Sequence, residues 1–191
     1  MKQVLLIRHG ATAGNLQRRY IGCTDEPLCE QGRQQVLPLI GLQADRIVVS
    51  PMCRTRQTAE LVFPGQPWEL CHDLRETDFG AFEGKTADEL TDNENYANWL
   101  ASDCRTPIPG GEAVDAFKNR CCAAFLQIMA DSPSVSTTAF VIHGGGIMAI
   151  LEAFAVPKQE FYHWHLPNGG CIRAEMEEKG SVLTVVSDWQ L

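Results

Sequence analysis

Two histidines in this 191-residue chain share the same local sequence setting. His9 follows the apolar run 4–7 with only Arg8 between them, and His143 directly follows the apolar run 138–142. Each histidine precedes glycine, which lets the backbone approach a ligand closely. Ligands of open α/β sheets bind where the parallel strands end. The pattern therefore predicts that the two imidazoles face each other at one edge of a sheet.

Arginine and glutamate residues beside these strands complete a set that suits phosphate chemistry. Arg54 begins a predicted helix after the strand 46–50, where a cation is unfavourable unless an anion is bound nearby. Glu76 follows a third predicted strand and can reach the same edge, although composition alone leaves Asp78 and Glu83 as alternatives. Arginine binds phosphate oxygens, neutral histidine is a nucleophile, and a carboxylic acid can protonate a departing alkoxide. The set therefore indicates transfer of a phosphoryl group.

Other chemical patterns in the sequence are incomplete. The stretch 80–86 resembles a phosphate-binding loop but is one residue too short between its glycines. His163 and His165 lack a third ligand at metal-binding spacing, and the eight cysteines show no zinc-type spacing. We therefore expect no metal and no cofactor.

Composition limits the classes of protein to which the chain can belong. A net charge of −8 argues against general binding to nucleic acid or to a membrane surface. No apolar run approaches the length of a transmembrane helix, and the cysteine pattern favours reduced thiols. We expect a cytoplasmic protein whose partner is a small molecule. No sequence feature indicates an oligomeric state.

Strands alternate with helices along most of the chain. This alternation predicts a three-layer α/β sandwich with a mostly parallel sheet of about six strands. The expected strands are 2–7, 46–50, 68–71, 138–142, 170–176 and 181–187, and the expected longer helices are 30–42, 53–63, 112–130 and 147–154. A short connection between the last two strands implies one antiparallel strand. The acidic segment 73–109 is interpreted as a small helical cap inserted into a single domain, 1–191.

Four motifs in the same order resemble the histidine phosphatase, or phosphoglycerate-mutase-like, superfamily. They are Arg8-His9-Gly10 with Thr12 and Asn15, Ser50-Pro51 with Arg54 and residues 57–59, Glu76 with Phe79-Gly80 and Glu83-Gly84, and Ile142-His143-Gly144-Gly145. The resemblance implies that His9 takes the phosphoryl group and that Glu76 donates a proton and then activates water. It assigns phosphate contacts to Arg8, Arg54 and His143. It also implies substrate contacts for the residues Asn15, Ile21, Gly22 and Gly144, and it implies no metal.

Three further stretches resemble one group within this superfamily, the α-ribazole-phosphate phosphatases of cobalamin nucleotide-loop assembly. They are 22–28, 94–99, and 109–112 followed by Phe117 and Arg120. The expected substrate is thus a small phosphorylated metabolite, with α-ribazole 5'-phosphate preferred. Phosphoglycerate mutase and a broad-specificity sugar-phosphate phosphatase remain alternatives. A non-catalytic binder of phosphorylated ligands is less favoured because it leaves Glu76 without a role.

Aromatic side chains in the predicted cap have two equally good interpretations. Phe82, Tyr96 and Trp99 could stack on a flat base of the substrate. They could equally form the small hydrophobic core of the cap itself.

Overall fold

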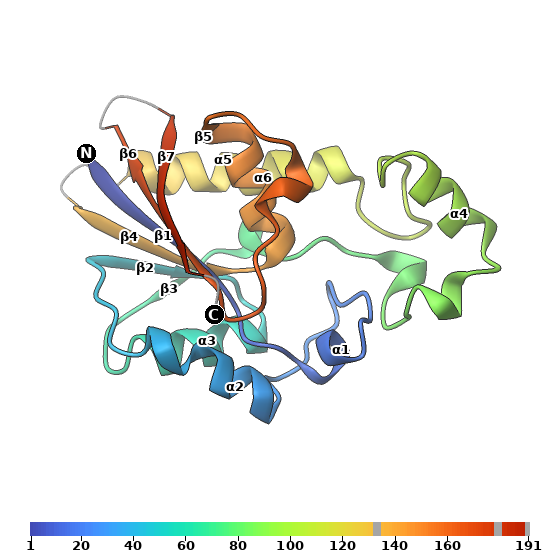
Figure 1. Cartoon of the computed structure of the whole chain (residues 1–191), viewed down its shortest axis with the longest axis horizontal. Helices are drawn as coiled ribbons and strands as arrows, with labels where there is room; N and C mark the ends of the chain where they lie inside the picture. Colours follow the sequence, from blue (N-terminus) through green and yellow to red (C-terminus); the bar gives the residue numbers. More distant parts are fainter. Residues whose placement is uncertain (132–134, 178–180, 190–191) are drawn as a thin grey trace.

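The computed structural model describes residues 1–131, 135–177 and 181–189. Helices pack against both faces of a central seven-stranded sheet (Figure 1). The strands are β1 (Lys2–Arg8), β2 (Arg46–Val49), β3 (Glu69–Leu70), β4 (Thr137–Ile142), β5 (Ala155–Val156), β6 (Cys171–Met176) and β7 (Leu183–Trp189). The predicted α/β fold is confirmed. The sheet has one strand more than expected, because the two-residue strand β5 pairs with β7.

The strand order β3-β2-β4-β1-β6-β7-β5 places β1 in the middle of the sheet. β1 is parallel to β4, and β4 is parallel to β2. β6 is antiparallel to both of its neighbours, β1 and β7, as the sequence predicted for one strand near the end of the chain. The carboxyl ends of β1, β2 and β4 therefore meet at one edge, and the residues that follow them are brought together.

The helices form the two outer layers. In chain order they are α1 (Ala13–Leu16), α2 (Glu30–Val36), α3 (Cys53–Val62), α4 (Glu94–Ala101), α5 (Val114–Ala130) and α6 (Gly144–Phe154). Short 3₁₀ helices are η1 (Leu37–Leu39), η2 (His72–Leu74), η3 (Gly80–Phe82), η4 (Asp88–Leu90) and η5 (Phe161–Trp164). In Figure 1, α2 and α3 lie below the sheet, and α5 and α6 lie above it.

Alternate residues of the central strand belong to different cores. Leu5 and Ile7 pack in the cluster that includes side chains of α2 and α3, whereas Val4 and Leu6 pack with α5 and α6. All four side chains are at most 2% exposed. Because successive side chains of a strand point to opposite faces, an unbroken apolar run is what a strand covered on both sides requires. The residues that follow β1 are thus attached to a rigid support.

One predicted helix is shorter than expected. The helix proposed for 30–42 ends at Val36 and continues as the 3₁₀ turn η1. Pro38 lies in that turn, and its nitrogen carries no hydrogen to continue the α-helical hydrogen bonds. The segment is helical as expected, but proline changes its hydrogen-bonding pattern after Val36.

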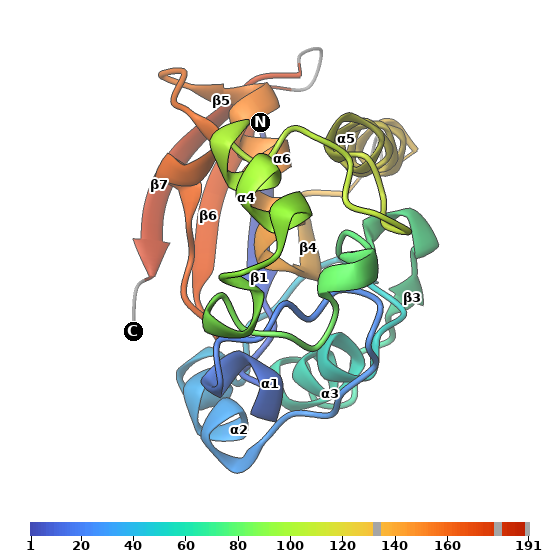
Figure 2. The same ribbon diagram turned by 90° about the vertical axis from the view of Figure 1, so that its right-hand side faces the viewer.

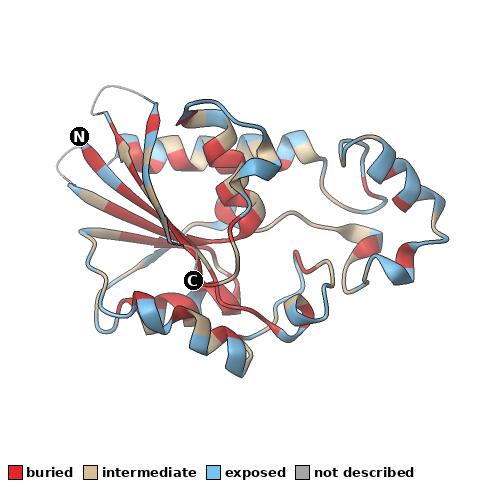
Figure 3. Cartoon of the chain, in the orientation of Figure 1, coloured by how far each residue is buried: buried red, intermediate tan, exposed pale blue. Residues whose placement is uncertain are grey.

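The segment after β3 leaves the sheet and forms a separate layer around α4 (Figures 1 and 2). It has its own hydrophobic cluster, which consists of Phe82, Leu90, Tyr96, Trp99 and Ile108. In Figure 3 the segment around α4 is largely exposed and contains a few buried stretches. Phe82 and Tyr96 therefore serve as core residues, whereas Trp99 both joins this core and lines a cavity.

Candidate active site

His9 follows β1 and is 4% exposed. Its Nδ1 lies 2.7 Å from the carbonyl oxygen of Gly10. A carbonyl oxygen can only accept a hydrogen bond, so Nδ1 carries the proton and a neutral ring keeps its lone pair on Nε2. This hydrogen bond therefore selects the tautomer in which Nε2 is a nucleophile.

His143 directly follows β4 and precedes α6, and its ring centroid lies 5.1 Å from that of His9. Arg54 Nε donates to His143 Nδ1 at 3.4 Å. The ring proton then resides on Nε2, which donates to the Ser50 hydroxyl at 2.7 Å. The structure thus brings the two predicted histidines together edge to face, with His143 held by two residues that follow β2.

Burial lowers the pKa of both imidazoles well below the ordinary value of 6.5. The charges of Arg54 and Arg8 lower the two pKa values further. Both rings are therefore neutral at physiological pH. For His9 this is the protonation state required of a nucleophile.

We expect both imidazoles to remain uncharged as the pH falls through 6.5. At that pH the unfolded chain begins to bind protons that the folded chain does not. The contribution of the two imidazoles to the free energy of unfolding should therefore be fully present above about pH 6.5 and decrease below it. NMR titration of the imidazole C–H signals and denaturant unfolding at several pH values measure these effects. His9→Asn should remove part of the pH dependence. Protonation of either buried ring near pH 6.5 would contradict the expectation.

Arg54 is fully buried near the start of α3. Its guanidinium donates to the carbonyl oxygens of Gly22 and Thr24, each at 2.8 Å. Arg54 therefore holds the loop that follows α1 and also contacts His143. These two backbone acceptors explain in part why an arginine stands in the first turn of α3, where a cation is otherwise unfavourable.

Arg8 is the last residue of β1 and lines the cavity described below. Its Nη1 donates to the Leu166 carbonyl at 2.6 Å, whereas its buried Nε has no hydrogen-bond partner among the described residues. A buried donor without a partner costs about 1–3 kcal/mol, so this N–H is a ready donor for an anion. Arg8 also packs against Gly144 at the beginning of α6, where backbone N–H groups favour anions.

Asn15 is oriented by two hydrogen bonds to its side-chain oxygen. Oδ1 accepts from the backbone N–H of Thr12 at 3.1 Å and from Asn168 at 3.3 Å. The amide NH₂ of Asn15, which lines the cavity, is thereby left to donate to a ligand. Asn168 also donates to the His9 carbonyl at 3.2 Å, a contact that sequence analysis missed. Its only sequence signal is a Pro-Asn-Gly turn.

The structure separates the three candidate acids. The carboxylate of Glu83 accepts from the backbone N–H groups of Gly22, Cys23 and Phe79 and so organises the loops. Asp78 accepts from the backbone N–H of Gly80 at 2.8 Å. The structure places Glu76 at the cavity, where its carboxylate accepts from Gly145 N at 3.1 Å.

Ile21 and Gly22 were both expected to contact the substrate, but only Ile21 lies at the cavity surface. Ile21 lines the cavity, whereas both backbone polar groups of Gly22 are already used by Glu83 and Arg54. A Cβ atom at Gly22 would lie 1.8 Å from the Thr77 carbonyl oxygen, so the loops meet there only because the residue is glycine. Gly22 thus supports the cavity wall.

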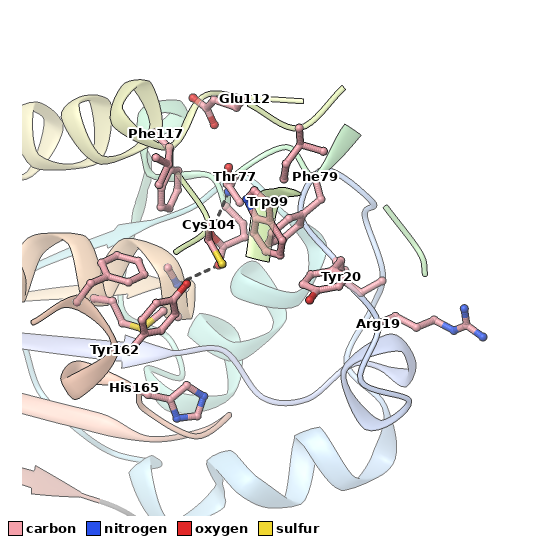
Figure 4. A pocket seen from close by; sticks show the side chains of 18 of the residues that line it. Arg19, Tyr20, Thr77, Phe79, Trp99, Cys104, Glu112, Phe117, Tyr162 and His165 are labelled. Atoms are coloured by element: carbon pink, nitrogen blue, oxygen red, sulfur yellow. Dashed lines mark hydrogen bonds between the residues drawn. The ribbon is translucent and has the colours of Figure 1, made fainter. Parts of the chain in front are cut away.

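A cavity of 370 Å³ opens between the sheet edge and the α4 segment (Figure 4). Aromatic side chains from several elements line it: Tyr20, Phe79, Trp99, Phe117, Phe161 and Tyr162. Tyr162 of η5 is hydrogen-bonded to Cys104, which follows α4. Two arginines reach the lining, but Arg19 forms an ion pair with Glu89 and points away from the aromatic side chains in Figure 4. The cavity is therefore mainly apolar beside a cationic end at Arg8.

Within the described residues, one cluster has the composition of a metal site, namely Cys23, Asp78 and Glu83. The hydrogen bonds of its two carboxylates to backbone N–H groups identify it as a loop contact. No helix of the described chain has the length and apolarity needed to cross a membrane.

Comparison with known proteins extends these observations. The sequence model of the histidine phosphatase superfamily (branch 1) matches residues 4–188. A relative named probable phosphoglycerate mutase GpmB, from Escherichia coli O1:K1 / APEC, is 32% identical over an alignment of 200 residues. The alignment covers 99% of this chain and 90% of the relative.

Solved structures of similar proteins carry two different names. A phosphoglycerate mutase from Thermus thermophilus superposes with a TM-score of 0.76 and 29% identity, covering 99% of both chains. A putative α-ribazole-5'-P phosphatase from Escherichia coli K-12 superposes with a TM-score of 0.87 over 96% of this chain and 94% of the other. Its identity is 23%, so this likeness concerns the fold.

Proposed function

The chain belongs to the histidine phosphatase superfamily, and we propose that it is a metal-independent phosphatase that forms a phosphohistidine at His9. The supporting observation is the hydrogen bond from Nδ1 to Gly10, which leaves Nε2 as the nucleophilic atom. Nε2 attacks phosphorus, the bond to the ester oxygen breaks so that the alcohol leaves, and the phosphoryl group becomes bonded to the imidazole. Water then attacks phosphorus, the P–N bond breaks, and inorganic phosphate leaves.

The charges around His9 suit the transferring group. Arg8 and Arg54 supply positive charge, and Arg8 Nε is a buried donor that no described residue of the protein accepts from. The Asn15 amide supplies another donor at the cavity wall. Such fixed donors stabilise the charge that develops on phosphoryl oxygens, which is the main requirement of phosphoryl transfer.

Glu76 is assigned the proton transfers. It donates a proton to the departing alkoxide and afterwards accepts one from the attacking water, which returns both Glu76 and His9 to their starting states. Its position supports this assignment because the carboxylate lies at the cavity, bonded to the first turn of α6. A protein that only bound phosphorylated ligands, without turnover, would not need the Glu76 carboxylate at the cavity.

The preferred substrate is α-ribazole 5'-phosphate, with the segment 73–109 acting as the selecting cap. The aromatic lining suits a flat apolar group attached to the phosphate ester. A phosphoglycerate would bring a carboxylate that needs a second cation. In the described lining Arg19 is the cation besides Arg8, and it is paired with Glu89. The names of the relatives nevertheless make mutase activity the second candidate.

We expect release of inorganic phosphate from α-ribazole 5'-phosphate at undiminished rate in the presence of EDTA. Parallel assays with a sugar phosphate and with 3-phosphoglycerate, followed by product analysis, distinguish the alternatives. Equal rates on all esters would indicate a broad-specificity phosphatase, and conversion of 3-phosphoglycerate to 2-phosphoglycerate would indicate a mutase. Binding of these esters without turnover would reject the proposed hydrolysis.

A further inference from the structure

The side chain of Arg120, on α5, makes five hydrogen bonds to oxygen. Nη1 donates to the carbonyls of Asp73 and Arg75 at 2.7 and 2.8 Å, and Nη2 donates to the carbonyl of Glu76 at 3.0 Å. All five N–H donors of the guanidinium are thus used. The three backbone acceptors belong to the strand-to-cap connection that ends at Glu76.

Glu112 fixes the orientation of Arg120. Its two carboxylate oxygens accept from Nε and Nη2, each at 2.7 Å. The ion pair is largely shielded, with side-chain exposures of 16% for Arg120 and 21% for Glu112. Such a bidentate pair holds the guanidinium plane in one direction. Glu112 and Arg120 lie in stretches that resemble those of known phosphatases, but neither has a direct part in the proposed phosphoryl transfer.

Glu76 itself has little space for displacement. Its carboxylate oxygens accept from the N–H groups of Thr77 and Gly145 at 2.9 and 3.1 Å. A Cβ atom at Gly145 would lie 2.4 Å from Glu76 Oε1 and 3.0 Å from the Phe117 ring. Phe117 also packs against the guanidinium of Arg120, 5.0 Å from its ring centroid. The carboxylate thus lies where a small backbone shift would break its contacts.

We propose that Arg120, oriented by Glu112, is a positioning residue that holds the Glu76 backbone so that its carboxyl group reaches the leaving-group oxygen. The inference rests on the proposed function, because it assumes that Glu76 is the acid. Arginine is required because a lysine ammonium is a point donor that cannot contact Glu112 and three carbonyls in these directions. A misplacement of about 1 Å reduces the rate about 100-fold in comparable sites.

Two esters of similar size distinguish positioning from general structural support. p-Nitrophenyl phosphate releases a stable phenolate that needs no acid, whereas benzyl phosphate releases a basic alkoxide that does. The value of kcat/KM reports the step in which this group leaves. For Arg120→Lys we expect a loss of about 100-fold with benzyl phosphate and little change with p-nitrophenyl phosphate. Glu112→Gln is a milder change. It should also reduce kcat/KM with benzyl phosphate more than with p-nitrophenyl phosphate, but by a smaller factor.

The double variant Arg120→Lys/Glu76→Gln should be no slower on benzyl phosphate than Glu76→Gln, because both changes remove the same proton transfer. Arg46→Lys is the matched control, since Arg46 likewise bonds a glutamate, Glu69, and a carbonyl of α5, but at the opposite end of β2. Equal losses on both esters, or additive losses in the double variant, would overturn the positioning role while leaving the proposed function intact. A wild-type protein that hydrolyses neither ester would overturn both.

Discussion

His9→Asn is expected to reduce kcat/KM by on the order of 10⁵-fold, the size of effect seen when a nucleophile is removed from a catalytic group. The asparagine amide can retain the hydrogen bond to the Gly10 carbonyl. It also fits the space of a residue that is 4% exposed, so the fold should be preserved. What the variant lacks is Nε2, the atom that we propose forms the bond to phosphorus.

A labelling experiment tests the same prediction directly. Wild-type protein mixed with a ³²P-labelled ester should acquire label that is stable to alkali and lost in acid, as expected of a P–N bond. His9→Asn should acquire none. His163→Asn is the matched control, because His163 is exposed and does not line the cavity. Turnover that persists in folded His9→Asn, or label elsewhere in the chain, would rule out His9 as the nucleophile.

Arg54→Met is expected to have the second-largest effect, a loss in kcat/KM on the order of 10³-fold. The change removes a guanidinium that lies near both imidazoles, and it keeps an apolar stem of similar length. It also leaves the carbonyls of Gly22 and Thr24 without their donor. We therefore expect a lower free energy of unfolding, by about 1–3 kcal/mol for each buried carbonyl that stays unpaired.

Two further measurements separate the electrostatic from the structural part of this effect. Arg54 lowers the pKa of His9 and His143, so both imidazoles should titrate at higher pH in Arg54→Met. Inhibition by inorganic phosphate should weaken as well. Arg56→Met, on the same helix but exposed, is the matched control and should change neither property. Unchanged imidazole titration together with near-normal kcat/KM would show that Arg54 is only a loop anchor.

Most of the fold could be predicted because strand burial is encoded locally. The alternation of Val4, Leu5, Leu6 and Ile7 between two cores is visible as an apolar run. The short edge strand β5 has no such signal, since two residues cannot show a period. The end of α2 depends on Pro38: the predicted helix 30–42 continued past this proline, which cannot donate the next α-helical hydrogen bond.

The candidate site, like the fold, could be predicted from the sequence only in part. The histidines follow strands of a parallel pair, so topology alone brings them together, as their 5.1 Å ring separation shows. The choice among Glu76, Asp78 and Glu83 depends on which backbone N–H groups each carboxylate meets. Those groups come from segments far apart in the chain.

The sequence by itself determined the α/β fold, the superfamily, and the strand ends at which His9 and His143 stand, because these depend on local periodicity and on short motifs. The tertiary structure alone decided three things: the tautomer of His9, the donors around Glu76, and the clamp formed by Glu112 and Arg120. Hydrogen bonds depend on distance and direction in space, and neither is encoded by the order of residues along the chain.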